Sequence, residues 1–85
     1  MRAVVQRVSE AAVHIAGVEH ARIPSGLLVL LGIEVGDTLE DLEWLCGKVV
    51  RLRIFTDAEG LMNLDVQQVH GDVMVVSLDE LFALA

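Results

Sequence analysis

The chain has 85 residues and a mass of 9.2 kDa, so we expect a single domain over residues 1–85 and exclude functions that need a cleft between two domains. Hydrophobic residues make up 54% of the chain and charged residues 22%, which is too apolar for disorder and too often interrupted by charge for a membrane span. A domain of this size buries only about 60% of its unfolded surface. We therefore expect exposed apolar surface that meets a second copy or a stretch of polypeptide outside this chain.

The charge balance is acidic. Six lysine and arginine residues against thirteen aspartate and glutamate residues give a net charge of −7, and the pI is near 4.6. Proteins that hold nucleic acid by charge alone cluster their cations. Here the cations are scattered along the chain as Arg2, Arg7, Arg22, Lys48, Arg51 and Arg53. Composition by itself thus argues against that kind of binding.

The cysteine content and the N-terminal residues both indicate a cytoplasmic protein. Cys46 is the only cysteine, so no internal disulfide can form and an oxidising compartment is not indicated. The first eight residues lack the apolar core and cleavage site of a secretory signal, and Arg7 interrupts them.

The N-terminal half reads mainly as strands. Residues 3–15 are rich in β-branched residues without helical spacing, and Gly17 marks a turn before a short returning strand at 19–23. The Pro-Ser-Gly at 24–26 is turn chemistry. Residues 27–31 are continuously apolar, which predicts a strand covered on both faces.

A helix is predicted after Thr38, because a capping residue precedes acidic residues in the first turns, where they favour the helix dipole. The acidic residues are Glu40, Asp41 and Glu43. The apolar stripe at three- and four-residue spacing consists of Leu42, Leu45, Cys46, Val49, Val50 and Leu52. Lys48 and Arg51 lie near the C-terminal end, where cations are favoured.

The remaining residues return to strands. A strand is expected at 53–56, a turn at 57–60, a hairpin partner at 61–66, and a last strand at 72–77 after a turn. Mostly strands with one long helix predict an α+β or mixed α/β domain. Residues 77–80 read Ser-Leu-Asp-Glu, a capping box that predicts a short final helix.

The sequence gives little support for a metal site or for a catalytic nucleophile. The possible soft ligands are solitary and lie in different elements: His14, His20, His70 and Cys46. Cys46 falls on the apolar stripe and is expected in the core. Any triad drawn from Ser77, His70 and Asp72 lacks the G-x-S-x-G pattern, and the glycines at 32 and 36 lack the lysine of a phosphate loop.

Two residues remain as candidates for a site. Arg7 lies mid-strand among apolar residues, so it faces an edge, a partner or an anionic ligand, or else it is a solvent-facing residue of an alternating strand. Ser77 lies where the backbone N–H groups of Leu78, Asp79 and Glu80 form a positive helix end. Such a junction binds an anion or a developing oxyanion, although ordinary capping is the commoner explanation.

Several segments, in order along nearly all of residues 1–77, closely resemble the D-aminoacyl-tRNA deacylase family. They are residues 1–11 (MRAVVQRVSEA), 26–34 (GLLVLLGIE) with Gly36, Asp37 and Thr38, 52–55 (LRIF) with Asp57, Gly60, Met62 and Asn63, and 75–77 (VVS). The resemblance implies that family's fold, a mostly antiparallel or mixed sheet or partial barrel with one long helix.

The resemblance also implies a function. Family members hydrolyse the ester between a D-amino acid or glycine and tRNA, act as homodimers with sites at the dimer interface, and use no metal or cofactor. The tRNA partner is held mainly at its acceptor end, which needs less basic surface than a wrapped duplex. Of the family's site residues, Ser77 and Arg7 carry over, Ser77 as the catalytic position with the backbone donors of residues 78–80 and Arg7 for substrate binding.

The chain departs from the family at two positions after Ser77. Leu78 and Glu80 stand where the family has glutamine and threonine, and the carboxylate would repel phosphate and ester oxygens. The family's Gly-Pro element, which screens chirality, has no counterpart in these residues. The leading hypothesis is a truncated or diverged D-aminoacyl-tRNA deacylase; the alternative is a non-catalytic dimerisation or protein-interaction module.

Overall fold

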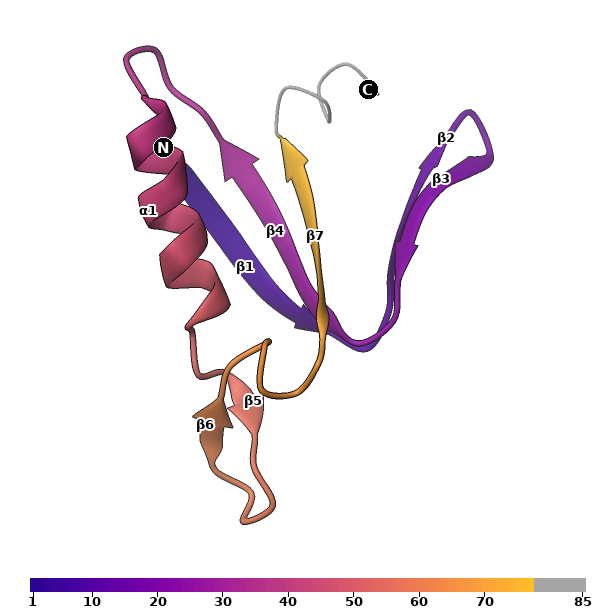
Figure 1. Ribbon diagram of the computed structural model, residues 1–85. Helices are drawn as coiled ribbons and strands as arrows, with labels where there is room; N and C mark the ends of the chain where they lie inside the picture. Colours follow the sequence, from indigo (N-terminus) through magenta and orange to yellow (C-terminus); the bar gives the residue numbers. More distant parts are fainter. Residues whose placement is uncertain (78–85) are drawn as a thin grey trace.

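A computed structural model describes residues 1–77 of the chain. Seven strands and one helix follow in the order β1 (Arg2–Val8), β2 (Ala11–Ile15), β3 (Val18–Ile23), β4 (Gly26–Gly32), α1 (Leu39–Val50), β5 (Phe55–Thr56), β6 (Met62–Leu64) and β7 (Asp72–Ser77) among these residues (Figure 1). The prediction of mostly strands with one long helix is confirmed.

The central feature is a three-stranded mixed sheet in the order β1-β4-β7. β1 runs antiparallel to β4, with Arg7 opposite Leu27, while β7 runs parallel to β4, with Ser77 opposite Leu31. The parallel pair needs a crossover, which α1 and the β5–β6 hairpin supply. Figure 1 shows α1 lying against one face of the sheet, on the side of β1 and β4.

β4 is covered unevenly, which corrects the expectation of cover on both faces. Leu27, Val29 and Leu31 are buried toward α1, whereas Leu28 and Leu30 on the opposite face are only half-buried. Alternate residues of a strand point to opposite faces, and only one face of β4 carries the helix. The continuous apolar run therefore reflects its central place in the sheet.

α1 begins as its sequence predicts. The side chain of Thr38 accepts from the backbone N–H of Asp41 at 3.2 Å, and the Asp41 carboxylate accepts from the N–H of Thr38 at 2.9 Å. This reciprocal pair satisfies two N–H groups that the helix leaves free. The helix ends at Val50, because the N–H groups of Arg51 and Leu52 bond carbonyls three residues back. Leu52, expected on the helical stripe, lies beyond it.

The first predicted strand is divided in two. β1 ends at Val8 and β2 begins at Ala11, because β2 leaves the sheet to pair with β3. The β2–β3 turn consists of Ala16 and Gly17 with φ of 52° and 79°, and two positive values are what a type I′ hairpin turn requires. Figure 1 shows this hairpin standing away from the three-stranded sheet.

The β5–β6 hairpin is shorter than the predicted strands at 53–56 and 61–66. A turn with reciprocal hydrogen bonds between Asp65 and Gln68 follows β6, and a loop ordered by Asp57 occupies the tip of the hairpin. The Asp57 carboxylate accepts from the backbone N–H groups of Glu59 at 2.9 Å and Leu61 at 3.0 Å. The Leu61 hydrogen bond, foremost, lowers the pKa of Asp57 below its usual value. Gly60 closes the turn with φ of +83°.

The core lies between α1, the sheet and the β5–β6 region. Its buried members are Leu27, Val29, Val49, Phe55 and Val66. Among residues 1–77 no polar or charged residue is buried. The molecule measures 42 × 34 × 14 Å, and this thin shape leaves large apolar side chains exposed, as the composition predicts. Cys46, expected in the core, is exposed.

Asp37 connects the N-terminus to the loop between β4 and α1. Its carboxylate accepts from the backbone N–H of Glu34 at 2.7 Å and from the Met1 ammonium at 3.1 Å. The Glu34 hydrogen bond, then that from the N-terminus, lowers the pKa of Asp37 below 3.8, against a smaller opposing effect of burial. The charged carboxylate therefore stabilises the folded state.

Asp37→Asn is expected to lower the urea midpoint of unfolding at neutral pH. A carboxyl whose folded-state pKa is lowered contributes stability above its ordinary value of 3.8 and loses that contribution as pH falls through the lowered value. The difference between variant and parent should thus shrink in acid. Urea unfolding followed by circular dichroism across this range checks it. A pH-independent difference would contradict the role of the charge.

Candidate functional site

Ser77 is the last residue of β7 and is half-buried. Because alternate strand residues share a face, Ser77 continues the row of Val73 and Val75 on the face that carries α1. The backbone N–H groups of Leu78, Asp79 and Glu80, and the predicted final helix, lie outside the described residues. The structure therefore places the serine of the candidate site and leaves its predicted backbone donors as a sequence expectation.

Arg7 lies near the end of β1, with its guanidinium exposed. Its Nη1 donates to the carbonyl of Ile54 at 3.0 Å and to the hydroxyl of Thr56 at 3.3 Å. Both acceptors are more than forty-five residues away in sequence and belong to the start of the β5–β6 hairpin. Arg7 therefore lies on an edge strand of the sheet, with an exposed side chain and two acceptors within the protein.

Within a single chain, Arg7 and Ser77 lie far apart. Arg7 is opposite Leu27 and Ser77 is opposite Leu31, so they are four residues apart along β4, or about 13 Å. They also lie on strands to either side of β4, roughly 10 Å apart. The two candidate residues therefore mark opposite ends of the sheet.

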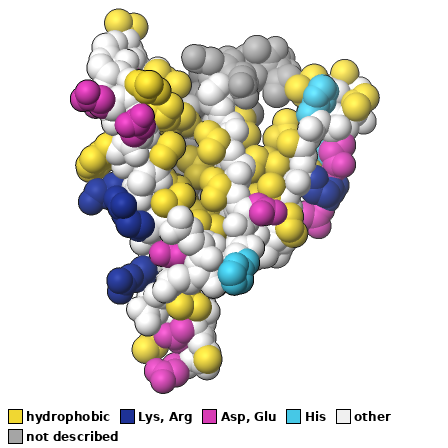
Figure 2. All heavy atoms as spheres, viewed as in Figure 1, with side chains coloured by type: hydrophobic (Ala, Val, Ile, Leu, Met, Phe, Trp, Pro, Cys, Tyr) yellow, Lys and Arg dark blue, Asp and Glu magenta, His cyan; other side chains and the backbone are white. Residues whose placement is uncertain are grey.

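The row that ends at Ser77 borders an apolar groove between α1 and β7. We call it the α1–β7 groove; its volume is about 70 Å³ and its lining residues are Val29, Leu31, Leu42, Leu45, Cys46, Val49, Val50, Val73 and Val75. Figure 2 shows hydrophobic side chains gathered between the helix and β7. Sequence reasoning missed this groove. The helical stripe and the apolar residues at 73–76 were its signals, and they indicated a helix and a strand without showing that the surface between them is uncovered.

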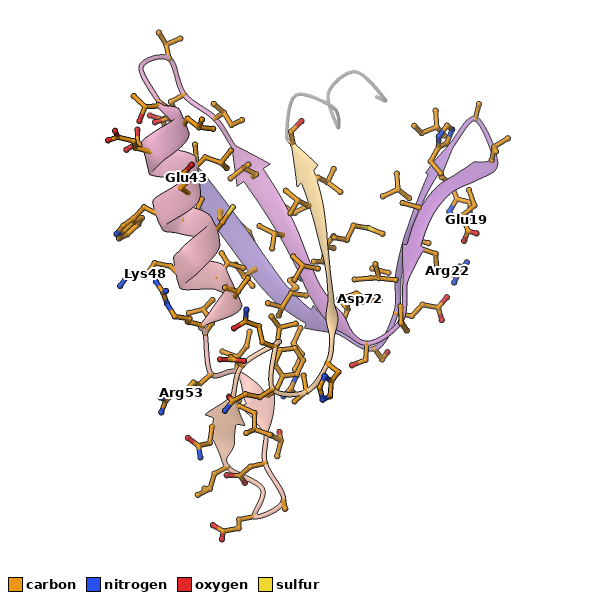
Figure 3. All side chains as sticks on the ribbon, viewed as in Figure 1. Glu19, Arg22, Glu43, Lys48, Arg53 and Asp72 are labelled. Carbon is orange, nitrogen blue, oxygen red and sulfur yellow. The ribbon has the colours of Figure 1, made fainter. Side chains whose placement is uncertain are left out.

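The charged residues lie at the periphery, and two of the six cations are already paired. Arg22 forms ion pairs with Glu10 and Glu19, and Arg2 lies 3.4 Å from Glu34. Lys48, in the last turn of α1, and Arg53, beyond the end of the helix, project to the same side of the molecule (Figure 3). Arg51 lies between them in sequence, so the cations that appeared scattered are partly gathered at the C-terminal end of the helix.

Within the described residues there is neither a metal centre nor a helix that could span a membrane. Residues 1–77 contain no group of three histidine, cysteine or carboxylate side chains placed to hold a metal ion. α1, the helix within this range, is neither long enough nor apolar enough to cross a bilayer.

The described residues combine a mixed sheet, in which β4 and β7 are parallel, with a single crossover helix and a last strand that ends in serine. Together these features define a class of small α/β folds. The family model described as D-Tyr-tRNA(Tyr) deacylase matches residues 4–85. The chain belongs to this family.

Comparison with curated proteins gives the same family. The chain is 57% identical over 77 residues to a D-aminoacyl-tRNA deacylase of Akkermansia muciniphila, a match that covers 91% of this chain and 51% of the relative. It is 52% identical over 83 residues to one from Cytophaga hutchinsonii, covering 98% of this chain and 55% of the relative. The chain thus spans about half the length of the curated relatives it matches.

A solved structure shares the fold. The chain titled c-Myc DNA Unwinding Element Binding Protein superposes with a TM-score of 0.87 at 38% sequence identity. The match covers 91% of this chain and 52% of that one. The expected D-aminoacyl-tRNA deacylase-like α/β fold is therefore confirmed, and the match again stops at about half of the neighbour.

Proposed function

We propose that this chain takes part in hydrolysing the ester between a D-amino acid or glycine and tRNA, as a D-aminoacyl-tRNA deacylase of translation quality control. The observation that carries the proposal is the family match over residues 4–85, with a relative of that name 57% identical to the chain. We expect the protein to act in the cytoplasm, where aminoacyl-tRNA is used.

Ser77 and Arg7 are the proposed site residues. Ser77 would lie at the reacting ester, with the backbone donors of residues 78–80 stabilising the oxyanion, and Arg7 would bind substrate through the nitrogens that its two protein acceptors leave free. The two residues lie at opposite ends of one sheet, and the homodimer that the resemblance implies would let one site take them from two copies. We therefore propose a homodimer with sites at the interface, as the family resemblance implies.

The acceptor end of tRNA is the proposed partner. On a chain with net charge −7, phosphates are attracted only where cations gather. Lys48, Arg51 and Arg53 supply such a place at the C-terminal end of α1, and Arg7 is tied to Ile54, the residue after Arg53. A small basic patch is sufficient to hold a short single-stranded end.

A non-catalytic interaction module is the second candidate. Two observations favour it: Leu78 and Glu80 replace the polar residues of the family pattern, and the chain spans only about half of each relative. In this case the chain would keep the fold and bind protein, with no turnover of the ester.

The test is hydrolysis of D-tyrosyl-tRNA and L-tyrosyl-tRNA by the chain, compared with buffer alone. Leu78→Gln/Glu80→Thr, which restores the family's side chains, is measured beside it, and sedimentation of the same samples reports the dimer. We expect D-selective cleavage that is slow in the parent and faster in the double variant, because the Glu80 carboxylate repels the substrate oxygens.

The outcomes separate the two candidates. D-selective cleavage by the parent supports the deacylase. Cleavage by the double variant alone, or by neither protein, overturns deacylase activity for this chain and supports the interaction module. Equal cleavage of both esters contradicts the proposed chiral selection.

A further inference from the structure

The outer face of α1 carries an exposed tryptophan beside the cations at the end of the helix. Trp44 is 66% exposed and is the only tryptophan of the chain. The Lys48 ammonium lies 5.5 Å from the centroid of its ring, within the range of a cation–π contact. Figure 3 shows Lys48 pointing away from the sheet. This face therefore presents a flat aromatic surface with a positive charge next to it.

Arg51 extends the same face, because it follows Trp44 by seven residues, or about two turns of helix. Its guanidinium folds back along α1 over Gly47: a Cβ at Gly47 would lie 3.1 Å from Arg51 Nη2. Lys48 and Arg51 thus lie on the C-terminal side of the ring. Glu40, in the first turn, is one turn before Trp44 on the N-terminal side. The ring is flanked by a carboxylate on one side and by two cations on the other.

These cations have no acidic partner within the protein. Lys48, Arg51 and Arg53 form no ion pair with any residue in the range 1–77. Arg2 and Arg22, by contrast, each pair with glutamate. On a chain with net charge −7, unpaired cations beside an exposed ring form a local positive surface. A partner that fits this surface combines negative charge with a flat apolar face.

Unpaired nucleotides have both features. A base of any kind stacks on an aromatic ring, while its phosphates are held by nearby cations. The residues from Trp44 to Arg51 extend over about 10 Å of helix, and a stacked strand rises about 3.4 Å per nucleotide, so this face holds about three nucleotides. In a duplex the bases are stacked on one another and offer the ring no free face. An acidic peptide would supply the charge without the flat surface.

We propose that the outer face of α1 binds an unpaired stretch of RNA, with one base stacked on Trp44 and the phosphates against Lys48 and Arg51. This rests on the proposed function, because it adds a stacking residue to the basic patch assigned there to the acceptor end of tRNA. It does not require turnover of the ester. Binding of unreactive RNA and hydrolysis of aminoacyl-tRNA are measured separately, so the failure of one is distinguishable from the failure of the other.

Trp44 itself reports binding, because no other tryptophan contributes to the fluorescence. A single-stranded RNA of about a dozen nucleotides, without self-complementarity, is titrated into the 85-residue chain. We expect quenching of the Trp44 fluorescence as a base stacks on the ring. The logarithm of the association constant should fall with the logarithm of the salt concentration with a slope of about −2, as about three phosphate contacts on a single strand give. The same RNA annealed to its complement should bind at least about tenfold more weakly.

Matched variants locate the contact, with binding followed by the anisotropy of labelled RNA. Trp44→Ala should weaken binding by about tenfold or more, and Trp44→Phe should restore part of the loss. Lys48→Gln should weaken binding and reduce the salt slope by about 0.7. Arg2→Gln makes the same change of charge at a side chain that is 89% exposed on β1, and it should leave binding within about twofold of the parent. All three side chains are exposed, so each variant is expected to keep the fold, which circular dichroism checks.

The following results would overturn the proposal: no quenching of Trp44, equally tight binding of the duplex, equal effects of Lys48→Gln and Arg2→Gln, or equally tight binding of an oligoglutamate peptide. The last of these assigns the face to an acidic protein partner. D-selective cleavage of aminoacyl-tRNA without quenching by RNA overturns this inference alone. Quenching and the expected variant effects without cleavage support it and overturn the deacylase activity alone.

Discussion

Gly26→Ala is expected to destabilise the protein by at least about 3 kcal/mol, because an added methyl group would overlap backbone that has no room to move. A Cβ at this position would lie 1.9 Å from the Asp72 carbonyl oxygen and 2.8 Å from the Asp72 nitrogen. Gly26 and Asp72 are the first pair of the parallel β4–β7 ladder, so relief of the overlap separates the strands. A domain of this length has a total stability of roughly 4–13 kcal/mol, so the loss should be plain in urea unfolding.

Gly17→Ala is the matched control. A Cβ at Gly17 meets nothing within 4 Å, and the substitution adds only the cost of a side chain at φ of +79°. That cost is about 1 kcal/mol. Similar urea midpoints for the two alanine variants would show that β4 and β7 are not packed as closely as the structure has them.

Leu27→Ala is expected to cost about 3 kcal/mol, since it removes a side chain that is fully buried. Leu27 lies near the start of the central strand β4, and the core cluster to which it belongs includes Val49 of α1 and Phe55 of β5. These residues are held by separate elements and cannot all move inward to fill the space. The midpoint of urea unfolding should fall accordingly.

Leu39→Ala makes the same change at the first residue of α1, where the leucine is 71% exposed. It should alter stability by no more than about 0.5 kcal/mol. If Leu27→Ala proved as mild as Leu39→Ala, the core would not be centred on β4. The comparison therefore tests the core without assuming any function.

The sequence alone predicted those elements whose signals are local. Thr38 and the acidic residues after it predicted the start of α1, and the structure adds that Asp41 completes a capping box with Thr38. Gly17 predicts the β2–β3 turn through its tolerance of positive φ. The family resemblance, carried by short segments in order, is confirmed by the family model and the relatives.

Pairing between distant strands was decided by the tertiary structure. No local pattern shows that β7 runs parallel to β4, or that β2 leaves the sheet to pair with β3. Strand pairing depends on the path of the chain between strands. The expectation of a single strand over 3–15 was therefore wrong about Ser9 and Glu10, which lie between β1 and β2.

For the candidate site, too, the sequence identified the residues and the tertiary structure decided where they lie. Sequence reasoning selected Arg7 and Ser77 by residue type and motif, but their separation to opposite ends of the sheet follows from the register of β4 with its two neighbours. The acceptors of Arg7 in the β5–β6 region were likewise unpredictable from the sequence around it.

The stripe containing Cys46 correctly predicted an apolar helix face, yet only the fold shows that the part of this face beside β7 has no cover. The spacing of apolar residues along the helix indicates which side chains share its apolar face and avoid water. Whether a neighbouring element is present to exclude that water depends on the arrangement of the whole fold, and the open α1–β7 groove is therefore a feature that the tertiary structure alone reveals.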